Sequence, residues 1–435
     1  MDKKLYENYT AILREELMPA MGCTEPIAIA YASARARAVL GKMPEKIHVS
    51  CSGNIIKNVK GVIVPNSGNQ KGIEVAAILG AVGGNESKEL EVIAGATDEA
   101  RAMTKKLAAE KICSVSLAEN VPNLFIEVEA EADGHKSVVR IENHHTDITL
   151  ITLDGKIIFE KAPKKDEAKT SISTAQRNLM TLSSIIDYAN ELKIEDVKEI
   201  LERQIEFNSK ISQEGLDNKW GARVGKTVLE NWGSDVRSRA CARAAAGSDA
   251  RMSGCPLPVI INSGSGNQGI TVSLPVIEYA ENWHLSREKL YRALAVSNLV
   301  SIYIKHYIGS LSAFCGAVSA ASGAGAAITY MAGGDYQSIG GTITNTLANV
   351  GGIVCDGAKP SCAAKIASSV HAALMAHYMS MSDKEFLGGE GFVNDDVERT
   401  IKNMGYIGKI GMKETDKEIL NVMIDKIDVD SCLSN

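Results

Sequence analysis

The spacing of hydrophobic residues changes along the chain and separates parts with different secondary structure. Over residues 1–17 apolar side chains recur at helical intervals, and a second helix is expected from Pro26, because proline suits the first turn of a helix. From Lys46 to about residue 160, short β-branched runs alternate with polar residues, which is typical of strands. After about residue 168 strand signals nearly vanish, and the remaining segments predict successive helices.

Within the strand-rich part we expect helices over residues 72–82 and 98–110, and one of the predicted strands is the run GVIVPN at 61–66. The whole pattern predicts an α+β fold, in which a mainly α-helical catalytic domain carries an inserted, smaller α/β sheet domain. We place N-terminal helices that join the catalytic domain at 1–43, the inserted domain at 44–166, and the mainly helical catalytic domain at 167–435.

Composition and charge argue against several classes of partner and location. Lys and Arg number 47 against 53 Asp and Glu, a net charge of −6, and no basic run stands out, so no nucleic-acid partner is expected. The stretch from Tyr307 to Cys355 is poor in charge but too rich in Gly, Ser, Thr and Asn for lipid, so no membrane partner is expected. The charged, amphipathic N-terminus lacks the apolar core of a secretory signal, which predicts a cytoplasmic protein. A homo-oligomer remains open.

Three cysteines in the last third of the chain are the strongest candidates for chemistry. Cys315, Cys355 and Cys362 lie in glycine-rich, mostly uncharged surroundings, and three thiolates suit an iron-sulfur cluster or zinc. Structural burial is the alternative reading. Three ligands would leave a metal position open for substrate. Cys432, near the C-terminus, could fill that position at rest as a fourth ligand, or be a thiol on a frayed end.

Two turns rich in Asn, Ser and Gly precede predicted helices, at Asn66–Gly72 and Asn262–Gly269. Free backbone N–H groups at a helix start, flanked by hydroxyl and amide side chains, can hold a carboxylate or a phosphate, although such turns are also common as plain connectors. The candidate substrate-binding residues are Asn66, Ser67, Asn69, Ser263, Ser265 and Asn267. The similarity of 64–81 to 260–280 is either a duplicated half-site or a coincidence.

Cys23, in the sequence MGCTEP, precedes a predicted helix. The positive end of the helix dipole is expected to lower the pKa of this thiol and favour a thiolate that acts as nucleophile or base, with a buried structural cysteine as the alternative. The eight histidines show no metal-binding spacing and are interpreted as structural, and His306 is the one to watch because it lies near Cys315. Lys57, Asn58 and Lys359 are weaker candidates for substrate contact.

Taken together, MGCTEPIAIA, SGNIIKNVKGVIVPN, NSGSGNQG, SAFCGA and CDGAKPSC resemble the L-cysteine desulfidase family, relatives of the α subunit of iron-sulfur L-serine dehydratases. The resemblance spans nearly the whole chain. It implies a carbon-sulfur lyase, which converts the small-molecule amino-acid substrate L-cysteine to pyruvate, ammonia and sulfide by β-elimination, with a [4Fe-4S] cluster and without pyridoxal phosphate.

The resemblance also implies roles for residues. Cys315, Cys355 and Cys362 would be the cluster ligands, and Cys23 the proton acceptor. The spacing between Cys355 and Cys362 is shorter than in the serine dehydratases and similar to the desulfidase branch, which favours a thiol as leaving group. Two other readings remain: an L-serine dehydratase with the same cluster, and a non-catalytic metal-binding scaffold or redox sensor.

Overall fold

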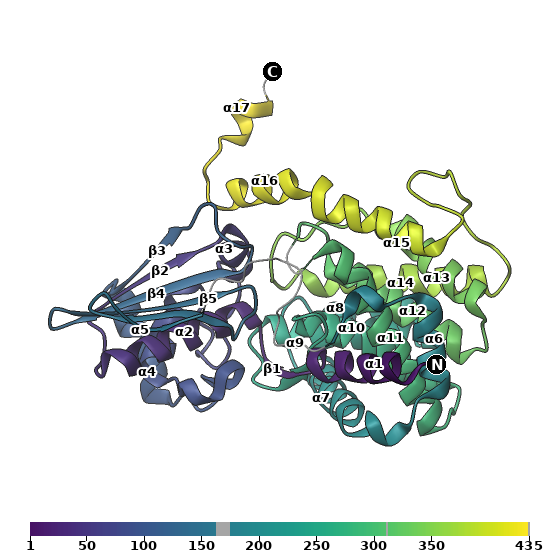
Figure 1. The fold of residues 1–435 in the computed structure, drawn as a ribbon, viewed down its shortest axis with the longest axis horizontal. Coiled ribbons are helices and arrows are strands. Elements are labelled where there is room, and N and C mark those ends of the chain that lie inside the picture. Colours follow the sequence, from purple (N-terminus) through teal and green to yellow (C-terminus); the bar gives the residue numbers. More distant parts are fainter. Residues whose placement is uncertain (162–174, 310–311, 434–435) are drawn as a thin grey trace.

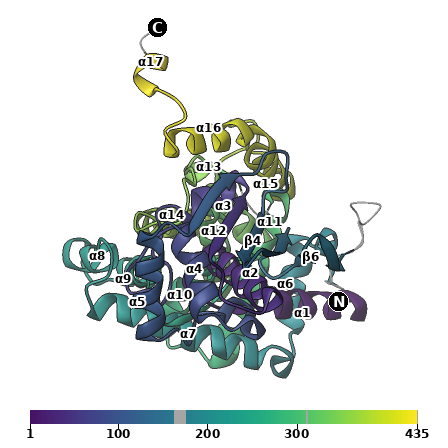
Figure 2. The ribbon, with the colours of Figure 1, turned by 90° about the vertical axis from the view of Figure 1, so that its left-hand side faces the viewer.

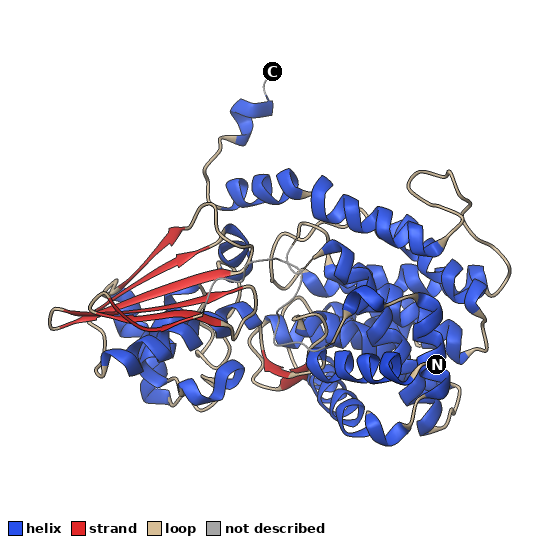
Figure 3. Ribbon diagram, viewed as in Figure 1, coloured by secondary structure: helices blue, strands red, loops and turns tan. Residues whose placement is uncertain are grey.

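The structure is a computed structural model that describes residues 1–161, 175–309 and 312–433, and it has two halves that lie side by side (Figure 1). One half is built on a six-stranded sheet, and the other consists almost wholly of helices (Figure 3). The predicted fold class, a helix-rich α+β protein with a smaller sheet-containing part, is confirmed. The proposed boundary between residues 166 and 167 falls outside the described residues.

The sheet has the strand order β3-β2-β4-β5-β6-β7, with β2 and β3 parallel and all other neighbours antiparallel. Along β4 and β5 buried and more exposed residues alternate, as expected for a sheet with one face in a core. Helices α2, α4 and α5 cover that face (Figures 1 and 2). The elements of this half are α2 (Thr24–Leu40), β2 (Lys46–Cys51), α3 (Gly53–Val59), α4 (Ile73–Gly83), η1 (Glu86–Glu91), α5 (Asp98–Ala109), β3 (Cys113–Leu117), β4 (Phe125–Ala132), β5 (His135–Glu142), β6 (Ile148–Leu153) and β7 (Lys156–Glu160).

The second helix packs in the sheet half, whereas the sequence led us to expect both N-terminal helices in the helical half. Helix α1 (Lys3–Glu16) does pack with the helical core, but the buried residues of α2 belong to the core beneath the sheet. Helix α2 lies between the sheet and α4, so it is apolar nearly all round. A Cβ atom on Gly80 would lie 2.2 Å from the Ala30 carbonyl oxygen, so glycine permits this close crossing of α2 and α4.

The segment between β2 and α4 also differs from the prediction. Residues 53–59 form helix α3, and the run at 61–66 is a turn whose one pairing is an isolated bridge between Ile63 and Lys71. Val62 and Val64 are nevertheless fully buried. Burial of this apolar run therefore comes from packing beneath the sheet without strand pairing.

The helical half is centred on α9, α10, α11, α12 and α14, which pack closely against one another. Small residues permit these close contacts: a Cβ atom on Gly323 of α12 would lie 2.4 Å from the Ser297 carbonyl oxygen of α11. The elements of this half, beside α1, are η2 (Arg177–Leu179), α6 (Leu182–Glu191), η3 (Ile194–Asp196), α7 (Lys198–Asp217), α8 (Val224–Trp232), α9 (Val236–Met252), α10 (Gly266–Asn282), α11 (Arg287–Ile308), α12 (Gly316–Met331), α13 (Tyr336–Val350), α14 (Cys362–Ser380), α15 (Val397–Tyr406) and η4 (Ile407–Gly411).

Within the described residues, β1 (Pro19–Met21) and α16 (Lys413–Met423) both contribute contacts that join the halves. Strand β1, just before α2, pairs with β8 (Pro258–Ile260), just before α10. Helix α16 returns along one side of the molecule to pack on α3, and the short α17 (Val429–Leu433) projects beyond it (Figure 1). No helix in the described part of the chain is long and apolar enough to cross a membrane.

Candidate active site

A cavity of about 380 Å³ opens between the sheet half and the helical half. The N-terminus of α2, the helix α3 and the turn before β6 line it from one side, and the starts of α10, α12 and α14 line it from the other. Of the residues predicted from sequence, the cavity brings together Cys23, Cys315, Cys355, Cys362, Ser263, Ser265 and Asn267. Residues nearly 340 positions apart in the sequence therefore share one site.

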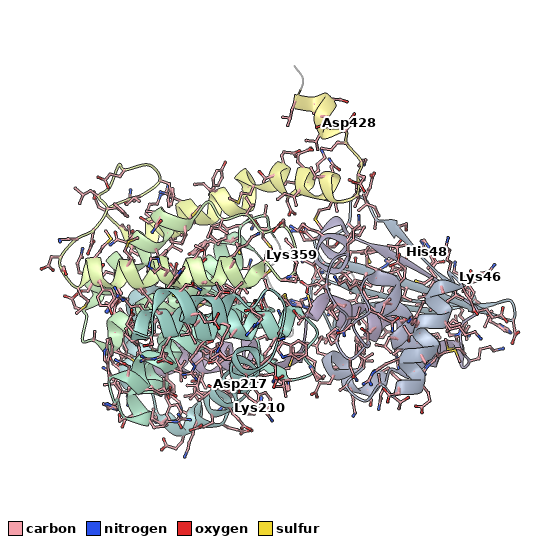
Figure 4. The ribbon with its side chains drawn as sticks, turned by 180° about the vertical axis from the view of Figure 1, so that it is seen from behind. Lys46, His48, Lys210, Asp217, Lys359 and Asp428 are labelled. Carbon is pink, nitrogen blue, oxygen red and sulfur yellow. The ribbon has the colours of Figure 1, made fainter. Side chains whose placement is uncertain are left out.

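The three late cysteines are held by two helix starts and the loop between them. Cys315 is the N-cap of α12, and Cys362 is the first residue of α14. The loop with Cys355 pairs with the segment before α12: the Cys315 N–H donates to the Ile353 carbonyl at 3.1 Å, and the Cys355 N–H to the Ala313 carbonyl at 2.5 Å. Figure 4 places Lys359, of the same loop, where the two halves meet.

The thiols interact electrostatically with one another, which indicates that they lie close together. Burial, followed by the negative charge of the neighbouring Cys355, raises the pKa of Cys315 to about 12, and burial also raises the pKa of Cys362. Coordination to a metal would remove the protons of these thiols. Cys315 and Cys362 also lie at helix N-termini, where thiolate charge is stabilised.

The donor set fits an iron-sulfur cluster. All three donors are sulfur, as such clusters prefer. Within the described ranges, no group of three or more His, Cys, Asp or Glu side chains is arranged to hold a single metal ion. A cluster spreads its ligands over several irons, so its thiols need not converge on a single metal atom.

Two buried lysines lie beside the thiols. Lys305 of α11 is 7% exposed; burial lowers its pKa to about 8, and the charges of Cys355 and Cys315 oppose that shift. Lys57 of α3 donates to the Cys355 carbonyl at 3.3 Å and forms an ion pair with Asp416 of α16. The C-terminal helix α16 thus helps to fix the loop that carries Cys355.

Cys23 is the N-cap of α2 and its thiol donates to the Glu25 Oε2 atom at 2.9 Å. Glu25 also accepts from the Thr24 hydroxyl and from the Asn58 Nδ2 group, each at 3.2 Å. The expected lowering of the Cys23 pKa is wrong for this structure. Burial, followed by the negative charge of Glu25, raises that pKa well above its usual value, and the opposing effect of Arg251 is smaller. Glu25, which accepts the hydrogen bond of this thiol, is nevertheless placed to take its proton.

The turn before α10 faces the same cavity. Ser265 is the N-cap of α10, and the Ser263 hydroxyl donates to the Asn262 Oδ1 atom at 2.9 Å. The Thr24 hydroxyl donates to the Gly264 carbonyl at 3.1 Å, which ties the turn to the residue that follows Cys23. The backbone is left-handed at Ser263 (φ +50°) and Gly264 (φ +74°), so the turn bends sharply as it enters the helix.

The similar turn at 66–72 lies outside the cavity, and its polar side chains form hydrogen bonds within the protein. Asn66, Ser67 and Asn69 do not line the cavity. The Asn66 amide donates to the carbonyls of Ile93 and Ala94, and the Ser67 hydroxyl donates to the Gln70 carbonyl. The structure gives these two side chains a role in ordering the connections of α4 and α5.

Three other candidates also occupy positions that the sequence could not specify. Cys432 is exposed on the projecting α17 and does not line the cavity (Figure 1). The Lys359 ammonium donates to the Asp356 carbonyl at 2.8 Å. His306 does line the cavity, but it is an exposed residue.

Several residues that line the cavity were missed or interpreted as structural from sequence. Glu25 stands two positions after Cys23, and that proximity is the one local signal that could have found it. Four others have buried polar atoms without a hydrogen-bond partner among the described residues: Asn54 Oδ1, His145 Nε2, Arg251 Nε and Gln268 Oε1. Because buried polar atoms are nearly always paired, this group indicates a site for a polar ligand.

A family model and several curated relatives match the chain. The family model described as "Serine dehydratase alpha chain" matches residues 87–421, a range that contains the three late cysteines but not Cys23. A UPF0597 protein of Lachnoclostridium phytofermentans is 52% identical over 97% of this chain and all of its own. UPF0597 proteins of Desulfitobacterium hafniense and Finegoldia magna are 50% and 49% identical, over 97% of this chain in each case and over 98% and 100% of their own.

Proposed function

Because the chain belongs to the serine dehydratase alpha chain family, we propose that it is an iron-sulfur-dependent lyase that eliminates the β-substituent of an amino acid without pyridoxal phosphate. The proposed reaction converts L-cysteine to pyruvate, ammonia and sulfide in the cytoplasm, as a step of cysteine catabolism. One observation carries the proposal: three thiols, a thiol–carboxylate pair and the start of α10 line a single cavity.

Cys315, Cys355 and Cys362 would hold the [4Fe-4S] cluster, and Cys432 remains a proposed fourth ligand of the resting enzyme. When bound, the cluster supplies an open iron that acts as a Lewis acid toward the substrate. Lys57 fixes the loop of Cys355 through the carbonyl of that residue. Lys305 places a positive charge next to the ligand thiolates.

The proton chemistry falls to Cys23 and Glu25. Elimination requires removal of the weakly acidic α-proton, and the base must be largely unprotonated when it reacts. In this proposal the Cys23 thiol gives its proton to Glu25, and the resulting thiolate takes the α-proton of the substrate. Ser263, Ser265 and Asn267 orient the substrate from the start of α10. The enamine that is left after elimination hydrolyses to pyruvate and ammonia without further help from the protein.

The experiment is to purify the protein without oxygen and to supply L-cysteine or L-serine without pyridoxal phosphate. Release of sulfide and pyruvate in equal amounts, with a higher kcat/KM for L-cysteine, is the expected result. Higher kcat/KM for L-serine would move the assignment to L-serine dehydratase. Failure to turn over either amino acid, or a requirement for pyridoxal phosphate, would refute the proposal, and bound zinc with no turnover would favour the metal-binding scaffold.

A further inference from the structure

Arg251, at the C-terminal end of α9, is a buried cation that lines the cavity. The residue is 3% exposed, and no carboxylate in the described part of the chain forms an ion pair with it. Its Nη1 group donates to the Asn267 Oδ1 atom at 3.1 Å, and its Nε group has no partner among the described residues. Burying a guanidinium is unfavourable unless it is paired and fully hydrogen-bonded, so this arrangement calls for an anion in the cavity.

The first turn of α10 completes an anion site around the guanidinium. A Cβ atom on Gly266 would lie 2.2 Å from the Arg251 Nε atom, so the guanidinium lies directly against the backbone there only because residue 266 is glycine. Helix α10 is 17 residues long, and the free N–H groups of its first turn favour a negative charge. Two independent features thus meet at one point of the cavity.

The neighbours of Arg251 indicate which anion fits. Arg251 interacts electrostatically with Cys23, Glu25 and Cys362, so its charge acts on both the proposed base and a proposed cluster ligand. A multiply charged phosphate would be repelled by Glu25 and by the thiolates, whereas a single carboxylate matches one guanidinium. Lys305 and Lys57 are further buried cations in the cavity, but Lys305 interacts with Cys355 and Cys315, and Lys57 is paired with Asp416.

We propose that Arg251 binds the α-carboxylate of the substrate and makes the site selective for free α-amino acids. This inference rests on the proposed function. The carboxylate and the α-hydrogen of an α-amino acid are bonded to the same carbon atom. A carboxylate at Arg251 therefore brings the α-hydrogen toward Cys23, while the β-substituent can point to the cluster. Amino-acid amides and esters, and cysteine within a peptide, lack this carboxylate and are rejected.

The test compares L-alanine, which has no leaving group, with L-alaninamide, in which the carboxylate is neutral. Calorimetric titration of the full chain is expected to show much tighter binding of L-alanine. Arg251→Met is expected to weaken L-alanine binding at least ~30-fold and to remove most of the discrimination, because a buried charge partner is lost. Arg251→Lys is expected to restore part of the discrimination between L-alanine and L-alaninamide. Lys305→Met is the matched control, since it removes a different buried cation of the same cavity and is expected to retain the preference for L-alanine.

A second variant keeps the test decisive if Arg251→Met does not fold. Gly266→Ala keeps the charge but displaces the guanidinium, so it should also weaken L-alanine binding. In turnover, Arg251→Met should raise KM for L-cysteine far more than it lowers kcat. Equal binding of L-alanine and L-alaninamide to the wild-type protein, or an unchanged KM in an active Arg251→Met enzyme, would overturn the inference and leave the proposed function standing. Preserved discrimination in a protein that forms no sulfide from L-cysteine would instead refute the function alone.

Discussion

The role of Glu25 yields a prediction in which two mechanisms give opposite results. Glu25→Gln keeps the size of the side chain but removes the carboxylate that accepts the hydrogen bond of the Cys23 thiol, with 2.9 Å between Sγ and Oε2. The charge of Glu25 is also one cause of the raised pKa of Cys23, so the substitution lowers that pKa and increases the thiolate fraction at a given pH. If the thiolate needed no partner, the variant would be as active as the wild type or more active.

If Glu25 takes the thiol proton, as proposed here, the variant loses its proton acceptor. A positioned acid–base group typically contributes ~10²–10⁴ in rate, so we expect kcat to fall by that factor, or by about 3–5 kcal/mol of transition-state stabilisation. Wild-type activity should rise with pH as the Cys23 thiol loses its proton. The residual activity of the variant should rise at a lower pH, because the thiol no longer has a negative neighbour.

The assay is the initial rate of pyruvate and sulfide formation from L-cysteine across a pH series, under anaerobic conditions. Glu16→Gln is the matched control, because Glu16 lines the same cavity but pairs with Arg177. We expect this control to change kcat little. A Glu25→Gln variant with an intact cluster spectrum and wild-type kcat would refute the role assigned to Glu25.

Three further substitutions test the site and the packing. Cys355→Ala should abolish the visible chromophore of the purified protein, whereas Cys23→Ala should keep the chromophore and lose pyruvate formation; loss of the chromophore in both would make Cys23 a ligand. Gly80→Val should lower the free energy of unfolding in urea by at least ~2 kcal/mol, because the added carbons meet the backbone of α2, and an unchanged midpoint would contradict the close crossing. Lys57→Met should lower the free energy of unfolding by ~1–3 kcal/mol, since the partly buried Asp416 loses its partner. A more stable variant would contradict that reasoning.

The elements that were predicted best from the sequence have a strong local periodicity of hydrophobic residues. The alternation in β4 and β5 and the amphipathic spacing in α1 reflect one buried face, so the residues themselves indicate which side is covered. Helix α2 has no such direction, because the sheet and α4 bury both of its sides. Its place beneath the sheet depends on contacts with distant residues, which a local pattern does not record.

The site was predictable where residue chemistry is distinctive and not where it depends on burial. Three cysteines in uncharged surroundings suggested soft-metal chemistry without knowledge of their positions. The direction of the Cys23 pKa shift was wrong because the helix dipole is a small effect beside burial and the charge of Glu25. Arg251 stands in an ordinary helical segment of the sequence, and its buried, unpaired state exists only in the folded chain.

The central claim is that Cys315, Cys355 and Cys362 hold an iron-sulfur cluster at the cavity that also contains Cys23. The iron and acid-labile sulfide content of the protein, purified without oxygen, tests this claim most directly. Our account predicts about four of each per chain in the wild type and a loss of both in Cys355→Ala. Wild-type protein that binds zinc, or that contains iron without labile sulfide, would contradict it.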